Sequence, residues 1–383
     1  MKQPPLAEKI SSIEAVLYDL LPASADNRWI NAVFSHLEVS PAAARPLIEP
    51  AYDLVRRGGK RWRPLLALLV CGALDGSERD CLPLTPLLEL SHNASLVHDD
   101  IEDHSDIRRG EPAVHIKYGE DIGINSGSFL YFLPLCCIDA WNAGVEQKNR
   151  MYRLWAEHMR RLHLGQAMDI TWHRDFDAIP DAGEYRAMCG LKTGSLARLA
   201  AMIGVLAASI ASPRLHQAGA GKTDEAIGSL GAAAEKLGVG FQILDDVKNL
   251  VTGNPGKKRG DDIVEGKKSL PVILYLQADC QTNSQTDRRD ADRRDAEGGV
   301  SRSSKKQFVR RCFQSARENG AAAPEVEELI ALLEASGAIA RARSQGEALI
   351  DEAKSVFWRE TCAGIPLNQR YRDLLAALID SMG

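Results

Sequence analysis

Residues 91–109 read SHNASLVHDDIEDHSDIRR, an apolar helical stretch that ends in a cluster of carboxylates. The apolar residues leading into it recur at helical spacing, which predicts one face of an amphipathic helix. Asp99, Asp100 and Asp103 form a DDxxD pattern, in which residues three and four apart are neighbours on a helix. Carboxylates this close repel one another unless a cation joins them, and Mg²⁺ prefers one or two carboxylates with waters and phosphates. Alone, the stretch is equally compatible with a solvated acidic helix end.

The composition of the chain favours one large helical protein. The chain has 383 residues, of which 45% are hydrophobic, so it can bury a sizeable core. Its formal net charge of -5 argues against a nucleic-acid-binding protein. No glycine-rich strand–turn–helix fingerprint is present, and alternating β-branched runs are few. We therefore predict an all-α bundle that forms a single domain over residues 1–383.

The cysteines and apolar runs bear on compartment and membrane contact. The eight cysteines show neither a CxxC pair nor a cysteine–histidine metal spacing, so we expect reduced thiols and a cytoplasmic protein. The first residues, MKQPPLAEKISSIEAV, have no apolar signal core. The longest uncharged run, residues 122–138, contains Gly, Asn, Ser and Pro and is shorter than a membrane span. We interpret it as a buried helix and predict no transmembrane segment.

Basic residues lie close to turns and helix starts. Lys60 and Arg63 belong to RRGGKRWRP at residues 56–64, where two glycines precede a predicted helix. Glycines and a helix N-terminus suit a phosphate, although a basic surface loop is also compatible with this stretch. Arg108 and Arg109 add fixed donors that match phosphate oxygens.

Two further polar features have more than one interpretation. His92 lies seven residues before Asp99 and therefore on the same helix face. It can be a satisfied core histidine or a donor to phosphate. Lys192 and Thr193 precede a helix rich in small residues, where they can hold a diphosphate or form an ordinary cap.

A second acidic cluster lies in GFQILDDVKNL at residues 240–250. Asp245 and Asn249 are one turn apart, and the apolar residues around them would make unpaired acids costly. Lys257 and Lys267 follow in a glycine-rich segment, so these cations again indicate a bound polyanion. Two acidic patches on separate helices can face one another across a bundle core. Metals, cations and a dry cavity without a nucleophile set suit loss of diphosphate from a substrate that can bear positive charge.

With these motifs together, the chain resembles the trans-isoprenyl diphosphate synthases, the farnesyl and geranylgeranyl diphosphate synthase family, and is most similar in motif to the eukaryotic-type geranylgeranyl enzymes. The motifs run in family order over most of residues 55–275. They are GGKRWRP (58–64), HNASLVHDDIED with RRG (92–110), GQAMD (165–169), KTGS (192–195), FQILDDVKNL (241–250) and GKKRGDDIVEGKKSLP (256–271).

This resemblance implies the all-α isoprenoid synthase type I fold, with a central cavity for metal and diphosphate. It implies three Mg²⁺ ions, two held by Asp99 and Asp103 with Asp100 in support, and one held by Asp245. The residues implied to act on the allylic diphosphate are Arg108, Lys192 and Lys257, with Thr193, Gln242, Asp246, Asn249 and Lys267 nearby. Those implied to bind isopentenyl diphosphate are Lys60, Arg63, His92 and Arg109.

The product is expected to be C20 or longer, made from C5–C15 allylic primers. Ala94 and Ser95, the residues five and four before Asp99, are small and leave a tunnel for the tail open, whereas short-chain family members place aromatic plugs there. Phe129 is a candidate for a deeper floor, together with Tyr131 and Phe132.

Two departures from the family pattern stand out. The second motif reads DDVKN where many members have DDxxD, so Asn249 would offer a neutral ligand, as in the eukaryotic-type enzymes. His104 follows the first motif without an assigned role. The charged, repetitive residues 281–306 are predicted to be an exposed insert without a catalytic part.

Four other functions compete with chain elongation to C20 or longer. A terpene cyclase on the same scaffold would not need the basic residues of the second diphosphate site, and a C15 farnesyl diphosphate synthase would need a shorter tunnel. A non-catalytic partner subunit usually lacks aspartates that are all present here. An HD-type phosphohydrolase would use His98 and Asp99 but needs further metal-binding residues. The resemblance also implies a homodimer.

Overall fold

The computed structural model describes residues 4–35, 38–253, 258–278 and 302–381. The regular elements of this part of the chain are helices apart from two short antiparallel pairs, β1 (Ile107–Arg108) with β2 (Glu111–Pro112) and β3 (Thr361–Cys362) with β4 (Ile365–Pro366). The all-α prediction is confirmed. Lys257 and most of the predicted insert, residues 281–301, lie outside the described residues, and residues 302–306 belong to helix α18.

The chain forms two compact units. Unit 1 comprises Met1–Leu162, Thr193–Gly238 and Asp351–Gly383, and unit 2 comprises His163–Lys192 and Val239–Ile350. Three α-helices contribute residues to both units, α10 (Val145–Arg174), α14 (Ala220–Val251) and α20 (Ala338–Phe357), and so does the π-helix η4 (Gly190–Gly194). The single domain over residues 1–383 stays a prediction.

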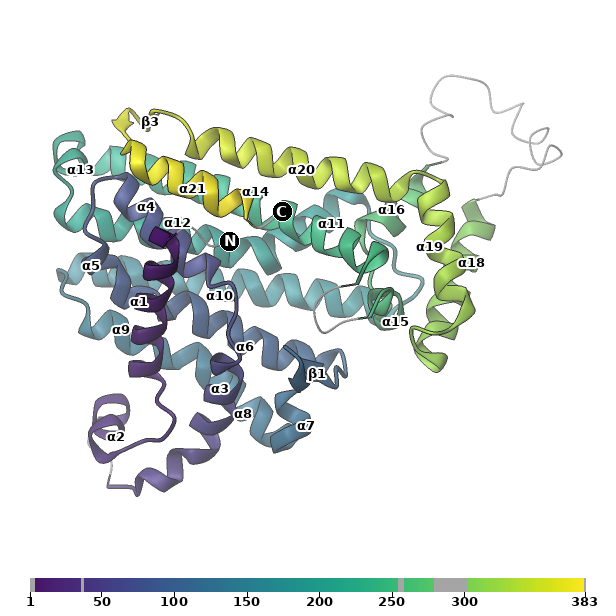
Figure 1. Cartoon of the computed structure of the whole chain (residues 1–383), viewed down its shortest axis with the longest axis horizontal. Helices are drawn as coiled ribbons and strands as arrows, with labels where there is room; N and C mark the ends of the chain where they lie inside the picture. The colour runs from purple at the N-terminus through teal and green to yellow at the C-terminus, as the bar shows by residue number, and fades with distance from the viewer. Residues whose placement is uncertain (1–3, 36–37, 254–257, 279–301, 382–383) are drawn as a thin grey trace. The chain divides into compact units, whose positions relative to one another are not determined.

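Unit 1 is built around α4 (Trp62–Ala73), which lies against α12 (Ser195–Ala211) and α21 (Gln369–Asp380) (Figure 1). Most alanines of α12, such as Ala200 and Ala201, are fully buried, and their small side chains let two helices approach closely. The remaining elements of this unit are α1 (Pro4–Leu20), α2 (Asn27–Phe34), η1 (Pro41–Ala44), α3 (Arg45–Arg56), α5 (Glu78–Cys81), η2 (Leu82–Leu84), α6 (Pro86–Glu102), α7 (Val114–Tyr118), α8 (Glu120–Phe132), η3 (Leu133–Leu135), α9 (Cys136–Ala140) and α13 (Pro213–Ala218).

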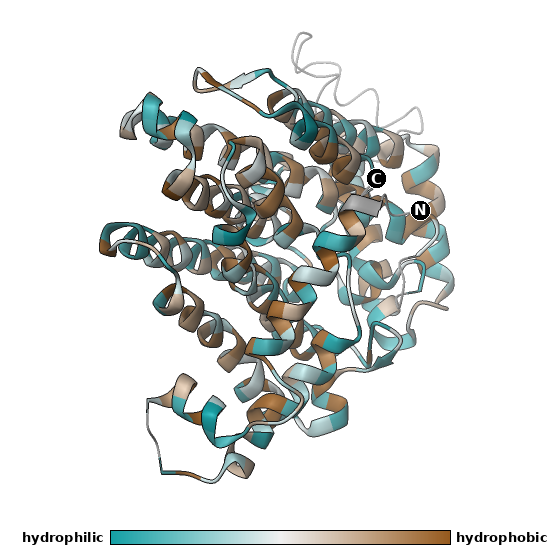
Figure 2. Cartoon of the chain, turned by 60° about the vertical axis from the view of Figure 1, so that its left-hand side comes forward, coloured by the Kyte–Doolittle hydropathy of each residue, from teal (hydrophilic) through white to brown (hydrophobic). Residues whose placement is uncertain are grey.

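Unit 2 has its own apolar core, to which Tyr185, Ile243, Phe313 and Leu329 belong. In helix α18 the buried residues recur at helical spacing, so one face packs inward while Lys306, Arg310 and Arg311 stay exposed. Figure 2 shows this division into hydrophilic and hydrophobic sides along the helices. The other elements of this unit are α11 (Ala182–Cys189), α15 (Asp261–Glu265), α16 (Leu270–Gln277), α18 (Arg302–Asn319) and α19 (Pro324–Ala335).

Two helical stretches are long and apolar enough to cross a membrane by length and composition alone. In Ala182–Ala211, 78% of the apolar window is buried inside the protein, as in a core helix. In Glu120–Ala140, 50% of the apolar window is buried inside the protein. Residues 122–138 are therefore only partly buried, and not buried throughout as we predicted. The seven described cysteines are free thiols, as expected.

Candidate active site

The first acidic cluster lies at the C-terminal end of α6, and its three aspartates differ in environment. Asp99 and Asp103 are half-buried, whereas Asp100 is fully buried. The Nε of Arg108 donates to both carboxylate oxygens of Asp100, at 2.9 and 3.1 Å. Burial raises the pKa of Asp100, and the hydrogen bond from Arg108 lowers it. Asp100 is therefore bound by Arg108 of the same chain, whereas Asp99 and Asp103 remain partly accessible.

The turn after α6 sets the positions of both arginines. His104 ends the helix with a left-handed φ of 53°, which gives this histidine a role in chain reversal. Arg109 and Gly110 then form the two-residue turn between β1 and β2, with φ of 54° and 80°. Positive φ at both positions is typical of a type I′ turn. The turn sends Arg108 to Asp100, whereas Arg109 Nη1 donates to Leu54 O at 3.1 Å and to Asn93 Oδ1 at 3.2 Å.

The buried Arg63 of α4 and the half-buried Arg109 act electrostatically on His92 of α6. Burial lowers the pKa of Arg63 to about 10, and burial likewise lowers that of Arg109 to about 10. Burial and then the charges of Arg63 and Arg109 lower the pKa of His92 well below its usual value. The imidazole is therefore neutral at pH 7 and can donate one hydrogen bond. A neutral donor among guanidinium groups is suited to an anion.

Sequence reasoning missed Glu89 and Asn93, which support this basic cluster by bonding to Arg61 and Arg109. The side chain of Arg61 is completely buried, with Nη1 2.6 Å from Glu89 Oε1 and Nη2 2.7 Å from Val55 O. Asn93 donates to Glu89 Oε1 and accepts from Arg109. Glu89 was hidden because it lies ten residues before the acidic motif, in an apolar run that indicated only core. Lys60, by contrast, is exposed.

In unit 2 the π-helix η4 carries Lys192. Its Nζ donates to Asp169 Oδ2 of α10 at 2.7 Å, so the lysine predicted to grip diphosphate also has a protein partner. Single-turn π-helices often occur at functional sites. The neighbouring Thr193 is half-buried and belongs to unit 1.

The second acidic cluster repeats the division seen in the first. Asp245 is exposed on α14, whereas Asp246 is buried. Tyr185 Oη donates to Asp246 Oδ2 at 2.6 Å, and Gln242 Nε2 donates to Oδ1 at 2.9 Å. Burial raises the pKa of Asp246 to about 6 although both hydrogen bonds lower it, and the nearby charge of Lys267 lowers it too. Tyr185 was not foreseen, since it lies 61 residues away in sequence.

Asn249 and Lys267 are engaged with the segment that follows. Asn249 is fully buried, and its Oδ1 accepts from Asp262 N at 3.2 Å instead of being offered to a ligand. Its Nδ2 has no hydrogen-bond partner within the described chain. Lys267 forms an ion pair with Glu265 at 2.5 Å.

The acidic side chains fit a hard divalent cation. Asp99 and Asp103 present carboxylate oxygens from adjacent helical turns, the ligand type that Mg²⁺ prefers. No group of three or more His, Cys, Asp or Glu side chains is gathered around one point among the described residues. Few protein ligands are what Mg²⁺ needs when water and substrate phosphates complete its shell.

Similarity to known proteins decides the class of this site. The model of the polyprenyl synthetase family matches residues 44–302, which is more than half of the chain and contains every motif quoted above. The chain belongs to the polyprenyl synthetase family. Members are divalent-metal-dependent prenyltransferases that use isopentenyl and allylic diphosphates, so this synthase is a trans-prenyltransferase of that class.

Individual relatives agree with this assignment. A geranylfarnesyl diphosphate synthase of Aeropyrum pernix is 36% identical over 231 residues, which cover 58% of this chain and 68% of that protein. A geranylgeranyl pyrophosphate synthase of Eremothecium gossypii is 35% identical over 235 residues, covering 60% and 69%. The crystal structure of a geranylgeranyl pyrophosphate synthetase from Pyrococcus horikoshii superposes with a TM-score of 0.74 at 26% identity, covering 99% of this chain and 96% of the other. The predicted family, enzyme class and isoprenoid synthase fold are confirmed.

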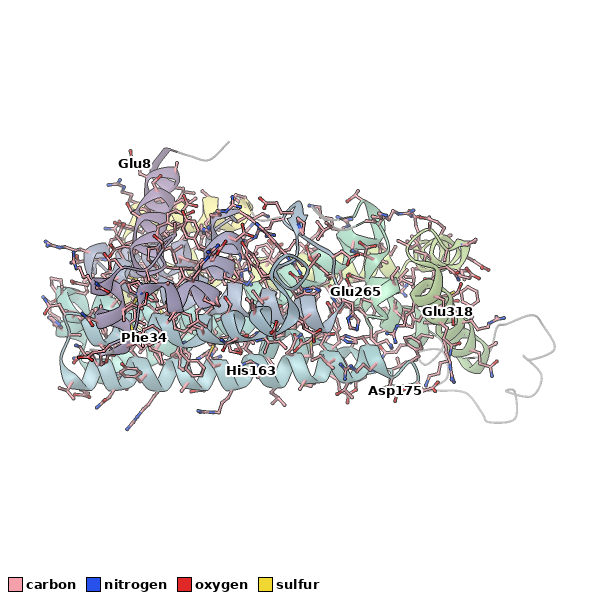
Figure 3. All side chains as sticks on the ribbon, turned by 90° about the horizontal axis from the view of Figure 1, so that it is seen from below. Glu8, Phe34, His163, Asp175, Glu265 and Glu318 are labelled. Carbon is pink, nitrogen blue, oxygen red and sulfur yellow. The ribbon has the colours of Figure 1, made fainter. Side chains whose placement is uncertain are left out.

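The candidate chain-length residues of this polyprenyl synthetase lie on different helix faces. Ser95 is half-buried and lies one turn before Asp99, on the same side of α6. Ala94 is completely buried and lies roughly 140° round the helix from Asp99. Phe129 of α8 stacks on Phe34 of α2, with ring centroids 5.9 Å apart (Phe34 is labelled in Figure 3).

The face of α8 that meets α6 is a different one. A side chain at Gly127 would meet His98 and Val97 of α6 at 3.0 Å, and Phe129 lies roughly 200° further round α8. Phe129 therefore packs against α2, and of the three candidates Ser95 is the one that shares the side of Asp99.

Proposed function

We propose that this enzyme joins isopentenyl diphosphate head to tail to an allylic diphosphate and releases a product of C20 or longer. The observation that carries the proposal is the arrangement on α6. His92, near the buried Arg63 and the half-buried Arg109, shares a helix face with Asp99 two turns away. This helix thus contributes both to a basic anion site and to a carboxylate pair of the type that binds metals. A terpene cyclase would need only the second of these.

The proposed roles follow from charge and accessibility. Asp99, Asp103 and Asp245 would hold three Mg²⁺ ions, which supply neutralising charge for the leaving diphosphate. Arg63, His92, Arg109 and Lys60 would bind isopentenyl diphosphate, and Lys192, Thr193, Gln242, Lys257 and Lys267 would orient the allylic diphosphate. Asp100 would position Arg108 through its hydrogen bonds, and Asp246 would position Gln242 in the same way while Tyr185 holds Asp246 in place.

The chemistry needs positioning more than a protein nucleophile. The allylic carbon–oxygen bond breaks, and the electron pair leaves with diphosphate. The isopentenyl double bond then attacks the allylic cation, forming the new carbon–carbon bond. Loss of one proton, accepted by the departing diphosphate, restores a double bond. The chain's own contribution is to hold both diphosphates and to keep water away from the cation.

The product length is supported by the small Ser95 on the side of Asp99 and by relatives named geranylgeranyl and geranylfarnesyl diphosphate synthases. We also propose that the enzyme is cytoplasmic, in keeping with its free thiols, and that it acts as a homodimer, as the family resemblance implies.

The test is incubation with labelled isopentenyl diphosphate, Mg²⁺ and each of the C5, C10 and C15 allylic primers, with mass analysis of the product. We expect C20 or longer products, and a loss of turnover of roughly 100-fold or more in Asp99→Ala and Asp245→Ala with the helical circular dichroism retained. Diphosphate release without isopentenyl diphosphate would indicate a cyclase, and a final C15 product a farnesyl diphosphate synthase. Phosphate release from nucleotides would support a phosphohydrolase.

A further inference from the structure

Two cations in unit 2 bridge the C-terminal ends of α10 and α15. Lys268 Nζ donates to Trp172 O of α10 and to Gly266 O beyond α15, both at 2.9 Å. Arg317 Nη2 of α18 makes the parallel pair of contacts, with His173 O at 2.8 Å and Glu265 O at 3.2 Å. Each cation thus takes one carbonyl from each helix end. We call Lys268 and Arg317 the carbonyl clasp.

Aromatic rings and a glycine complete the clasp. The ring of Phe176 lies under both cations, 4.4 Å from the Arg317 guanidinium and 5.2 Å from Lys268 Nζ, and Phe313 lies 4.6 Å from Lys268 Nζ. Gly266 has a left-handed φ of 79°, and a Cβ there would lie 2.8 Å from Phe176 and 3.0 Å from Arg317 Nη2. Asp175, just past α10, and Glu265 mark this region in Figure 3.

The electrostatics indicate that the clasp serves geometry more than stability. The last carbonyls of a helix lack partners and carry partial negative charge, so cations are favourable there. Lys268 is nevertheless only 3% exposed and forms no ion pair within the described chain. Burial, and next the charge of Arg317, lower its pKa to about 8. The charges of Asp175, Asp169 and Asp177 raise that pKa by less than burial and Arg317 lower it. Two neighbouring cations that bind carbonyls instead of carboxylates define the spacing of two helix ends at an electrostatic cost.

What the clasp fixes is the backbone that carries Lys267. Lys267 N donates to Asp262 O at 2.8 Å and so closes the turn at Gly266. The other end of α15 is held by Asn249, whose Oδ1 and main-chain oxygen accept from Asp262 N and Gly260 N. A helix of five residues has little stability of its own, so these contacts set where Lys267 lies.

We propose that Lys268 and Arg317 are positioning residues that hold Lys267 in place for the allylic diphosphate. The inference rests on the proposed role of Lys267. The two adjacent lysines would then have different roles: Lys267 binds substrate, and Lys268 points inward to the carbonyls.

The test compares Lys268→Met and Arg317→Met, which keep much of the apolar stem but lack the donors, by steady-state kinetics with both substrates. We expect the KM for the allylic diphosphate to rise roughly 10- to 100-fold. The KM for isopentenyl diphosphate should stay within about twofold, because its proposed ligands lie in unit 1. Arg317→Lys, which keeps one cation and its donors, should recover part of the loss.

The matched control is Arg310→Met, on the same helix, which loses only an exposed ion pair with Asp177 and should keep both KM values. If a Lys268 variant does not fold, the two Arg317 variants carry the test. Lys267→Met is measured in parallel. An unchanged allylic KM in Lys267→Met would refute the proposed role of Lys267 itself. The positioning role of the clasp alone would be overturned if Lys267→Met raised the allylic KM while the Lys268 and Arg317 variants kept that KM and showed only a lower melting temperature.

Discussion

Replacement of Gly165 by alanine should move the segment that carries Lys192. A Cβ at Gly165 of α10 would lie 2.4 Å from Lys192 N and 2.8 Å from Leu191 C, against an ordinary contact distance of 3.4–4 Å. These neighbours are backbone atoms of the π-helix and cannot rotate away. The π-helix must therefore shift by about 1 Å, or α10 must move instead.

The size of the effect follows from this collision. Overpacking of this kind costs about 1–3 kcal/mol, and the gain of alanine over glycine inside a helix returns about 0.5–1 kcal/mol. We expect a net loss of up to about 2.5 kcal/mol in the free energy of unfolding. Because Lys192 would shift from its 2.7 Å contact with Asp169, kcat/KM for the allylic diphosphate should fall roughly 100-fold.

Urea unfolding and steady-state kinetics measure the two effects on the same preparation. Gly228→Ala is the matched control: it lies inside α14 with nothing within 4 Å of the added Cβ. It should gain about 0.5–1 kcal/mol and keep its activity. Wild-type stability together with wild-type kcat/KM in Gly165→Ala would refute the reasoning, since it would mean that the π-helix yields without consequence.

Three further predictions concern buried or cavity-side residues. Tyr185→Phe removes a hydrogen bond to the buried Asp246 and should lower the free energy of unfolding by about 1–3 kcal/mol in urea titrations at pH 7. Ser95→Phe should shorten the longest product by mass analysis, because residue 95 lies on the side of Asp99; an unchanged spectrum would exclude that path for the tail. Burial lowers the pKa of Lys268 from 10.5, its value in the unfolded chain, to about 8 in the folded protein. Between pH 8 and 10.5 the unfolded chain therefore binds more protons than the folded protein, and the free energy of unfolding rises with pH across that window. Lys268→Met should remove this rise, by at most about 3 kcal/mol in unfolding titrations at pH 8 and 10.5.

Local sequence patterns were sufficient to predict helix α6 and to recognise the first acidic motif. The spacing up to Asp99 predicted helix α6, and the order of motifs predicted the family and the all-α fold. What spacing could not show was which carboxylate turns inward. Arg108, on strand β1, is the partner that holds Asp100 inward, and Tyr185, on helix α11, is the partner that holds Asp246 inward. Such pairings depend on tertiary packing, to which a sequence period gives no access.

The two acidic pairs share one design, and it gives a physical reason for the asparagine at 249. In each pair the second aspartate, Asp100 or Asp246, is buried and bound by protein donors, while the first is more accessible. Adjacent residues on a helix point about 100° apart, so one member can stay accessible while its neighbour meets the core. Asn249 lies three residues after Asp246, fully buried and bonded to Asp262 N. An aspartate there would place a second buried charge one turn from a carboxylate whose pKa burial has already raised to about 6. The neutral amide keeps the hydrogen bond that anchors α15 and avoids that repulsion.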